Sequence, residues 1–473
     1  MPALTPPVTA DALTLAHRIP PGFVMGTATA AAQIEGMRTS AGRSVWDDFA
    51  AQPGHVLDGS DTSVTCDHVH RYADDVALMS ELGIDAYRFS FAWPRLQPGG
   101  TGALDPSGVD FYDRMLDELA AHGIAAFATL YHWDTPSELG GWLDRDTALR
   151  FGDFASLVGE RFADRVSHWI TLNEPATVTL NGYALGIHAP GEALLFDALP
   201  TVHHQLLGHG LAVQALRAAS VPGRIGITNS HTPVQPATES AEDAVMAQLF
   251  DMVHNRVFAE PVLLGRYPDA PAELEAMFGA LGNTDAADLA TIHQPLDFYG
   301  LNYYMPSRIA AGPGSGDSPD GSAEAMSDLP FHLVDIDEYP RTGFGWPIAP
   351  EHLGTALGEL RDRYGTALPP VYITENGASF ADDVAADGTV HDPERVAFIA
   401  QHLNAALDAV SPGGVAEGVD LRGYFVWSLL DNWEWAAGFT QRFGLVHVDF
   451  DTLERTPKSS FRWLREVLAA RKA

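Results

Sequence analysis

Short apolar, β-branched runs alternate with longer segments of helical periodicity along the whole chain. The strand-like runs occupy residues 23–27, 86–90, 125–131, 166–173, 224–229, 298–302, 371–375 and 422–427. Between them, apolar residues recur at spacings of three and four, as in Val69, Tyr72, Val76 and Met79, which is typical of an amphipathic helix. Strands that alternate with helices predict parallel βαβ units. Eight such units predict an α/β fold, a (β/α)8 TIM barrel.

The segments between these runs show no change of composition that would mark a domain boundary. Residues 311–328 are rich in Gly, Ser, Pro and Asp and lie between two predicted strands, so we expect them to form a mobile rim loop. We therefore expect one domain over residues 1–473, a barrel with extended loops around its active site. Residues 1–18 precede the first strand and are expected to form a loosely ordered N-terminal arm.

Charge narrows the classes of partner. The chain carries 62 acidic and 28 basic residues, a formal net charge of −34. Nucleic acid binding needs Lys and Arg to neutralise phosphates, so no nucleic acid partner is expected, and an anionic membrane surface is equally disfavoured. No apolar run reaches the length of about 18 residues that a membrane-spanning helix requires. The oligomeric state stays open, and a homo-oligomer is compatible with the sequence.

Cysteine content and the N-terminal residues bear on location. Cys66 is the only cysteine, so the chain forms no internal disulfide and nothing indicates an oxidising compartment. The N-terminal residues show no basic region followed by an apolar one, as a secretory signal would. We therefore expect a cytoplasmic protein.

Two glutamates at the ends of strand-like runs are the leading candidates for chemistry. Glu174 closes the run ITLNE and precedes Pro175, and Glu375 closes VYITE and precedes Asn376-Gly377. A single glutamate at a strand end is usually a solvated acid. Two in matched settings would meet at the C-terminal mouth of a parallel barrel, where active sites lie. Cleavage of a glycosidic bond needs such a pair, one carboxyl as acid/base and the other as nucleophile or base.

Further motifs follow one another in a fixed order. They are FVMGTATA (23–30), QIEG (33–36), CDH (66–68), YRFS (87–90), WPR (93–95), YHWD (131–134), HAPG (188–191), GLNYY (300–304) and WSLLDNWEW (427–435). Together with the two glutamate segments they make the chain resemble glycoside hydrolase family one, the β-glucosidase family, along nearly its full length.

The resemblance implies a role for each glutamate. Glu174 would be the acid/base and Glu375 the nucleophile of a retaining double displacement, with the carboxyls roughly 5 Å apart. The charge of Glu375 would raise the pKa of Glu174 and keep it protonated near neutrality. Arg88 and Tyr304 would hold Glu375 ionised and oriented.

The resemblance also implies a sugar-binding site. Its substrate-binding residues would be Gln33, His132, Trp133, Asn173, Asn302, Tyr304, Trp346, Trp427, Glu434 and Trp435. Gln33 and Glu434 would each bind sugar hydroxyls in a bidentate way, Trp427 would form the stacking floor, and Trp346 would lie on the aglycone side. Glu434 stands where relatives that cleave 6-phosphorylated sugars bind the phosphate, which disfavours phosphoglycosides.

No cofactor or metal is implied. His203, His204 and His209 lie on one predicted helix, but His204 and His209 are five residues apart and no acidic residue accompanies them, so we interpret them as structural. Most aromatic residues in any protein belong to its core, and we assign Trp433 and Trp463 to that class.

The sequence thus predicts a retaining, exo-acting β-glycosidase that hydrolyses neutral β-glucosides or short oligosaccharides. Turnover of β-fucosides and β-galactosides is also expected, because one Gln and one Glu can satisfy either epimer at O4. Two alternatives stay open. One is an enzyme that chiefly transfers the sugar to another sugar. The other is a non-catalytic glycan-binding protein on the same barrel, which the presence of both carboxylates disfavours.

Overall fold

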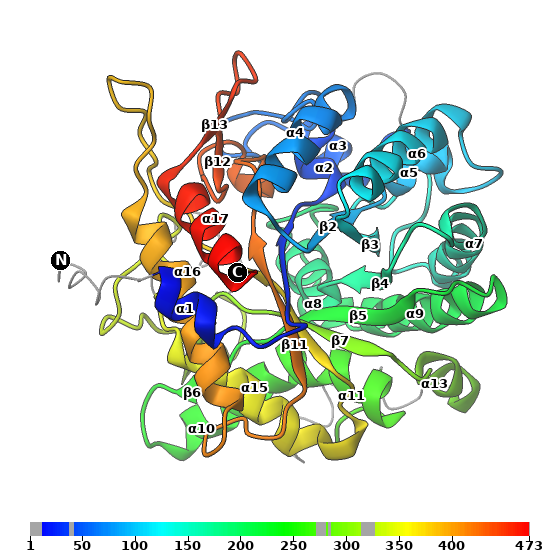
Figure 1. Ribbon diagram of the computed structural model, residues 1–473. Coiled ribbons are helices and arrows are strands. Elements are labelled where there is room, and N and C mark those ends of the chain that lie inside the picture. Colours follow the sequence, from blue (N-terminus) through cyan, green and yellow to red (C-terminus); the bar gives the residue numbers. More distant parts are fainter. Residues whose placement is uncertain (1–11, 37–41, 271–280, 282–284, 314–326, 473) are drawn as a thin grey trace.

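Eight parallel strands close into a barrel at the centre of the molecule (Figure 1). The computed structural model describes residues 12–36, 42–270, 281, 285–313 and 327–472. The barrel strands are β1 (Val24–Ala28), β2 (Ala86–Ser90), β3 (Ala125–Tyr131), β4 (His168–Asn173), β5 (Arg224–Ser230), β7 (Phe298–Asn302), β10 (Val371–Asn376) and β11 (Leu421–Trp427). Strand β1 pairs in parallel with both β2 and β11, which closes the barrel. The TIM barrel prediction is confirmed, and each predicted strand overlaps one of these eight.

Helices surround the barrel and cover its outer face (Figure 1). Among the described residues, no helix is long and apolar enough to cross a membrane. Longer helices are α4 (His68–Leu82), α6 (Pro106–Ala121), α7 (Arg145–Phe162), α9 (Pro200–Ala218), α10 (Ala241–Asp251), α15 (Glu351–Tyr364), α16 (Pro393–Val410) and α17 (Ser459–Arg471). Shorter ones are α1 (Ala12–Arg18), α2 (Ala31–Ile34), α3 (Val45–Ala50), α5 (Trp93–Leu96), α8 (Pro175–Thr177), α11 (Val257–Leu264) and α13 (Ala286–Ile292).

The helical pattern read from the sequence corresponds to burial. On α4, Val76 and Met79 are buried within the core. The side chain of Asp105 caps α6 by accepting from the backbone N–H groups of Ser107 and Gly108. Gly83 ends α4 at a φ of 83°, a conformation that glycine adopts without steric cost.

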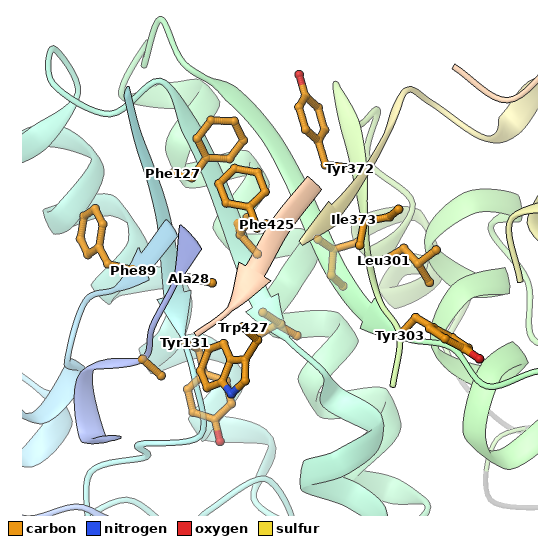
Figure 2. Packing of buried hydrophobic residues seen from close by; sticks show 14 of the residues in the cluster. Ala28, Phe89, Phe127, Tyr131, Leu301, Tyr303, Tyr372, Ile373, Phe425 and Trp427 are labelled. Carbon is orange, nitrogen blue, oxygen red and sulfur yellow. The ribbon is translucent and has the colours of Figure 1, made fainter. Parts of the chain in front are cut away.

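Aromatic rings from strands on opposite sides of the barrel meet in its interior. Phe127 on β3 stacks on His168 with ring centroids 3.8 Å apart and lies 4.8 Å from Phe425 on β11. Phe298 and Tyr372 are 5.6 Å apart, and each lies 5.4 Å from His168. Figure 2 shows Phe127 and Phe425 together, with Trp427 farther along β11 toward the other end of the barrel. These five rings, the aromatic floor, fill one end of the barrel and leave the strand C-termini as the place for a site.

The N-terminal prediction is partly wrong. Residues Ala12–Arg18 form helix α1, which packs against α17 and buries Leu15 and Ala16. Arg18 is hydrogen bonded to Asn404 and Asp408 on α16. The loosely ordered arm is therefore contradicted for residues 12–18, and residues 1–11 lie outside the described part of the chain.

Small sheets outside the barrel were not predicted. Strands β6 (Val234–Pro236), β8 (Ser307–Ala311) and β9 (Phe331–Leu333) form one of them, and β12 (Val446–Val448) pairs with β13 (Arg455–Pro457) in another. Most of the predicted rim loop, residues 314–326, lies outside the described residues, and β8 and β9 flank it.

Candidate active site

Two buried glutamates stand at the C-terminal ends of β4 and β10. Glu174 follows the last residue of β4 and is 6% exposed, and Glu375 is the penultimate residue of β10 and is 3% exposed. Glu174 has a φ of 46°, in the left-handed region. Trp133 and Trp435 share this unusual conformation, with φ values of 74° and 57°. Strained backbone at non-glycine residues persists where the surroundings enforce it, and it is concentrated at functional sites.

The position two residues after Glu375 has room only for a glycine, Gly377. A Cβ atom at this position would lie 1.7 Å from the carbonyl oxygen of Trp427. Only glycine therefore lets the segment after β10 pass against the end of β11.

Both carboxylate oxygens of Glu375 accept hydrogen bonds, one from a buried side chain and one from a partly buried side chain. Arg88, on β2, donates to Oε1 through Nη1, and the Tyr304 hydroxyl donates to Oε2 over 2.7 Å. Burial, followed by the charge of Glu375, raises the pKa of Tyr304 well above its usual value, so its hydroxyl stays a donor. The two donors fix the plane of the carboxylate and compensate its charge.

Glu174 has neutral partners instead. The Asn302 side chain donates to Oε1 and the Thr177 hydroxyl donates to Oε2, each over 2.7 Å. Burial, together with the negative charge of Glu375, raises the pKa of Glu174 to about 7. The two glutamates thus differ in the way that an acid and a nucleophile must differ. Sequence reasoning missed Thr177, whose only signal is its position three residues after Glu174, in the first turn of α8.

A network of side chains joins the two glutamates. Asn173 Oδ1 accepts from Arg88 Nη2 at 2.6 Å and from Asn302 Nδ2 at 3.0 Å. Thr374, which the sequence did not single out, donates to Asn302 Oδ1 over 2.7 Å. The Asn173 amide nitrogen lies 3.0 Å from His132 Nε2. Arg88, Asn173 and Asn302 therefore act as one unit that links Glu174 to Glu375.

Of the buried polar atoms near the site that have no hydrogen-bond partner among the described residues, three belong to predicted sugar-binding side chains. They are Gln33 Oε1, His132 Nδ1 and Glu434 Oε1. The Gln33 amide nitrogen is used within the fold, since it donates to Asn432 Oδ1 at 2.8 Å and to the Trp433 carbonyl at 2.9 Å. Leaving buried polar atoms without partners is costly. A ligand with several hydroxyl groups would satisfy all three.

Aromatic rings form the walls of the site. His132 stacks between Trp427 and Trp435, with both centroid distances 5.9 Å. Trp133 lies 4.5 Å from Trp435 and donates its indole N–H to the Asn173 carbonyl over 2.9 Å. Trp346 is partly exposed and contacts Tyr304 edge to face at 5.4 Å. Printed distances thus link to the two glutamates most of the residues predicted for the site, which are Arg88, His132, Trp133, Asn173, Asn302, Tyr304, Trp346, Trp427 and Trp435. Gln33 contacts the segment that carries Glu434 through Asn432 and Trp433.

Comparisons with known proteins decide the family. Residues 15–473 match the family model of glycosyl hydrolase family 1. The chain belongs to glycosyl hydrolase family 1. This confirms the family predicted from the motifs.

Relatives of this family 1 chain align along nearly their whole length. A thermostable beta-glucosidase B of Thermobispora bispora is 45% identical over 454 residues, which cover 95% of this chain and 90% of the relative. A bifunctional beta-D-glucosidase/beta-D-fucosidase of Bifidobacterium breve is 39% identical and covers 95% and 98%. The solved structure of a psychrophilic beta-glucosidase from Micrococcus antarcticus has a TM-score of 0.89 and 43% identity, covering 97% and 99%.

The histidines on α9 of this family 1 member contact neighbouring elements. His203 lies between the Tyr267 hydroxyl at 2.9 Å and Asp288 Oδ2 at 3.0 Å. His204 Nδ1 lies 2.9 Å from the Trp142 carbonyl, and His209 Nδ1 lies 2.6 Å from the Thr171 hydroxyl. These contacts fit the structural interpretation of the three residues.

Proposed function

We propose that this chain is a retaining, exo-acting β-glucosidase in which Glu375 is the nucleophile and Glu174 the acid/base. One observation carries the assignment of roles. Arg88 and Tyr304 donate to both oxygens of Glu375, whereas burial and the charge of Glu375 raise the pKa of Glu174 to about 7. Two carboxyls whose surroundings separate them in this way suit a nucleophile and a general acid.

In the first step a Glu375 oxygen attacks the anomeric carbon while the bond from that carbon to the aglycone oxygen breaks. Glu174 gives its proton to the departing oxygen, and the aglycone leaves as an alcohol. The sugar is now an ester of Glu375, so the negative charge that raised the pKa of Glu174 is gone.

In the second step Glu174, now ionised, takes a proton from water, and the water oxygen attacks the same carbon. The ester bond to Glu375 breaks, which returns both carboxyls to their starting states. Two inversions at one carbon retain its configuration.

Sugar recognition is assigned to the atoms that lack partners within the protein. Gln33 Oε1, His132 Nδ1 and Glu434 Oε1 are proposed to bind hydroxyl groups, with Trp427 as the stacking surface. Trp346, partly exposed beside Tyr304, is proposed to contact the aglycone. Burial raises the pKa of Glu434 to about 8, and a carboxyl here would repel a 6-phosphate when ionised.

A panel of aryl β-glycosides tests this assignment. We expect turnover of the glucoside, the fucoside and the galactoside, and none of the 6-phosphoglucoside, because the proposed sugar contacts Gln33, His132 and Glu434 would not compensate the charge of a buried phosphate. The measurement is kcat/KM on each substrate, with the Glu375→Gln protein as the blank. If the folded wild-type protein turned over no substrate of the panel, the result would favour the glycan-binding alternative. Turnover of the 6-phosphoglucoside would contradict the role of Glu434.

The pH profile tests the acid. Since the first step needs protonated Glu174, kcat/KM on a glucoside with a poor leaving group should fall as the pH rises through about 7, the pKa of Glu174. In Glu174→Ala, assayed on the same glucoside at high enzyme concentration, this alkaline limb should disappear. Burial raises the pKa of Glu434 to about 8, in the same range, so Glu434→Gln is the matched control and should keep the limb. If the fall in kcat/KM at alkaline pH persisted in Glu174→Ala, the titrating group would have to be a residue other than Glu174.

We also infer the natural setting of the enzyme. Short cello-oligosaccharides are proposed as substrates, which would place the enzyme at the last stage of cellulose degradation, and the single cysteine supports a cytoplasmic location. Transglycosylation is the second candidate activity. Product analysis at high substrate concentration separates the two, because transfer yields oligosaccharides in place of free sugar.

A further inference from the structure

A buried ionic cluster lies behind the segments that carry the sugar-binding residues. Its members, called here the Lys458 cluster, are Lys458, Asp382, Asp392, Arg395, Asp431 and Arg442. The Lys458 and Asp431 side chains are 0% exposed. Lys458 is one of two lysines in the chain, the other being Lys472, so a lysine at a fully buried position is exceptional here.

The Lys458 ammonium joins two loops at the mouth of the barrel. Its Nζ donates to Asp382 Oδ2 over 2.5 Å and to Asp431 Oδ1 over 2.6 Å. Asp382 lies in the segment after β10, the strand of Glu375, and Asp431 lies in the 428–435 segment after β11, which contains Glu434 and Trp435. One charged group thus ties the nucleophile's loop to the loop that carries the proposed sugar contacts.

Asp431 is held from several directions. Besides Lys458, its Oδ1 accepts from the Gly444 backbone N–H at 2.9 Å, and its Oδ2 accepts from Arg442 Nη1 at 2.8 Å. Burial opposes ionisation of Asp431, but the charges of Lys458 and Arg442 hold its pKa below the usual value. The main chain at the start of the 428–435 segment therefore has a fixed position.

The contacts continue from Asp431 to the sugar-binding side chains. The next residue, Asn432, accepts the Gln33 amide through Oδ1 at 2.8 Å and donates to the Ser428 hydroxyl over 3.1 Å. Glu434 comes two residues later. Gln33 and Glu434, both with buried unpartnered oxygens, thus take their positions from a segment that Lys458 anchors.

Stability alone is a poor explanation for such a cluster. Replacing buried ion pairs by apolar side chains often leaves stability unchanged or raises it. A lysine suits the geometry, because a compact ammonium with three donors fits between two carboxylates where a planar guanidinium would need more room. The three basic and three acidic groups balance in charge.

We propose that Lys458 is a positioning residue for sugar recognition. By holding Asp382 and Asp431 together, it sets the 428–435 segment so that Glu434 and Gln33 reach the hydroxyl groups at the far side of the sugar ring, including the one on C6. The inference rests on the proposed β-glucosidase function.

The test compares an aryl β-glucoside with the matching aryl β-xyloside, which lacks the C6 hydroxymethyl group. Lys458→Met removes the ammonium, and Lys458→Met/Asp382→Asn removes one charge of each sign, so the remaining cluster stays neutral. Lys472→Met, at the partly exposed second lysine, is the matched control. The ratio of kcat/KM values for the two substrates is the measurement, because it does not depend on the fraction of folded enzyme.

We expect the glucoside-to-xyloside ratio to fall about tenfold in both Lys458 variants, as for the loss of one hydrogen bond, with a rise in KM for the glucoside. The ratio should be unchanged in Lys472→Met. An unchanged ratio, with kcat/KM lowered equally on both substrates or on neither, would show that Lys458 only stabilises the fold and would overturn the proposal. Absence of glucoside turnover in the wild type would instead overturn the proposed function.

Discussion

Replacing Glu375 by Gln is expected to lower kcat for aryl β-glucosides by roughly 10⁴-fold or more, because an amide cannot form the glycosyl ester. The Gln amide oxygen can still accept from Arg88, and its amide nitrogen can donate to the Tyr304 hydroxyl, which rotates to accept, so the site should keep its shape. Steady-state kinetics measure the loss, and thermal unfolding checks that the variant is folded.

A covalent label makes the same prediction sharper. An activated 2-deoxy-2-fluoroglucoside forms the ester quickly and hydrolyses slowly, so intact mass should show one added sugar on the wild-type chain, and peptide mapping should place it on Glu375. Glu375→Gln should remain unlabelled. The matched control is Glu338→Gln, at an exposed glutamate paired with Arg308, which should retain both activity and labelling. A label on another residue would contradict the assignment.

Replacing Glu174 by Ala should have a large effect that depends on the leaving group. A poor leaving group needs the proton of Glu174, so turnover of alkyl glucosides should fall by about 10²–10⁴-fold. Activated aryl glucosides need little protonation and should still form the glycosyl ester, which then accumulates because no base activates water. Burst kinetics with an activated substrate would reveal this accumulation.

Azide distinguishes the roles of the two glutamates. In Glu174→Ala the small anion can occupy the space of the lost carboxyl and attack the ester, so added azide should restore turnover and give the β-glucosyl azide. The Glu375 variant has no ester to attack. If azide rescued that variant with a β-azide product, the two roles would have to be exchanged.

Much of the barrel could be predicted because each of its strands is a short apolar run and the helices between them show clear periodicity. Helix α1 could not be predicted in this way. It has seven residues, too few to be stable alone, and it forms because Leu15 and Ala16 pack against the rest of the molecule. The strands outside the barrel have three to five residues, and such lengths carry no pattern that distinguishes strand from loop.

The residues of the site likewise divide into those that the sequence indicated and those that it did not. Glu174 and Glu375 were recognisable from their neighbours in sequence, since a strand followed by Pro175 or Gly377 indicates the end of a barrel strand. Thr177 and Thr374 were not, because a hydroxyl residue becomes significant only through the carboxyl or amide that it meets. Lys458 is still harder to recognise from the sequence. Its partner Asp382 is 76 residues away, and no local pattern indicates that one ammonium joins two loops.

The aromatic floor closes one end of the barrel, so the site is reached only from the mouth at the strand C-termini. Passage through the barrel is obstructed by the rings of Phe127, His168, Phe298, Tyr372 and Phe425. A sugar must therefore leave by the mouth through which it arrived. In the proposed mechanism the aglycone departs first, and the freed sugar must then leave by the same mouth before another substrate can enter. Product and substrate therefore compete for the same passage.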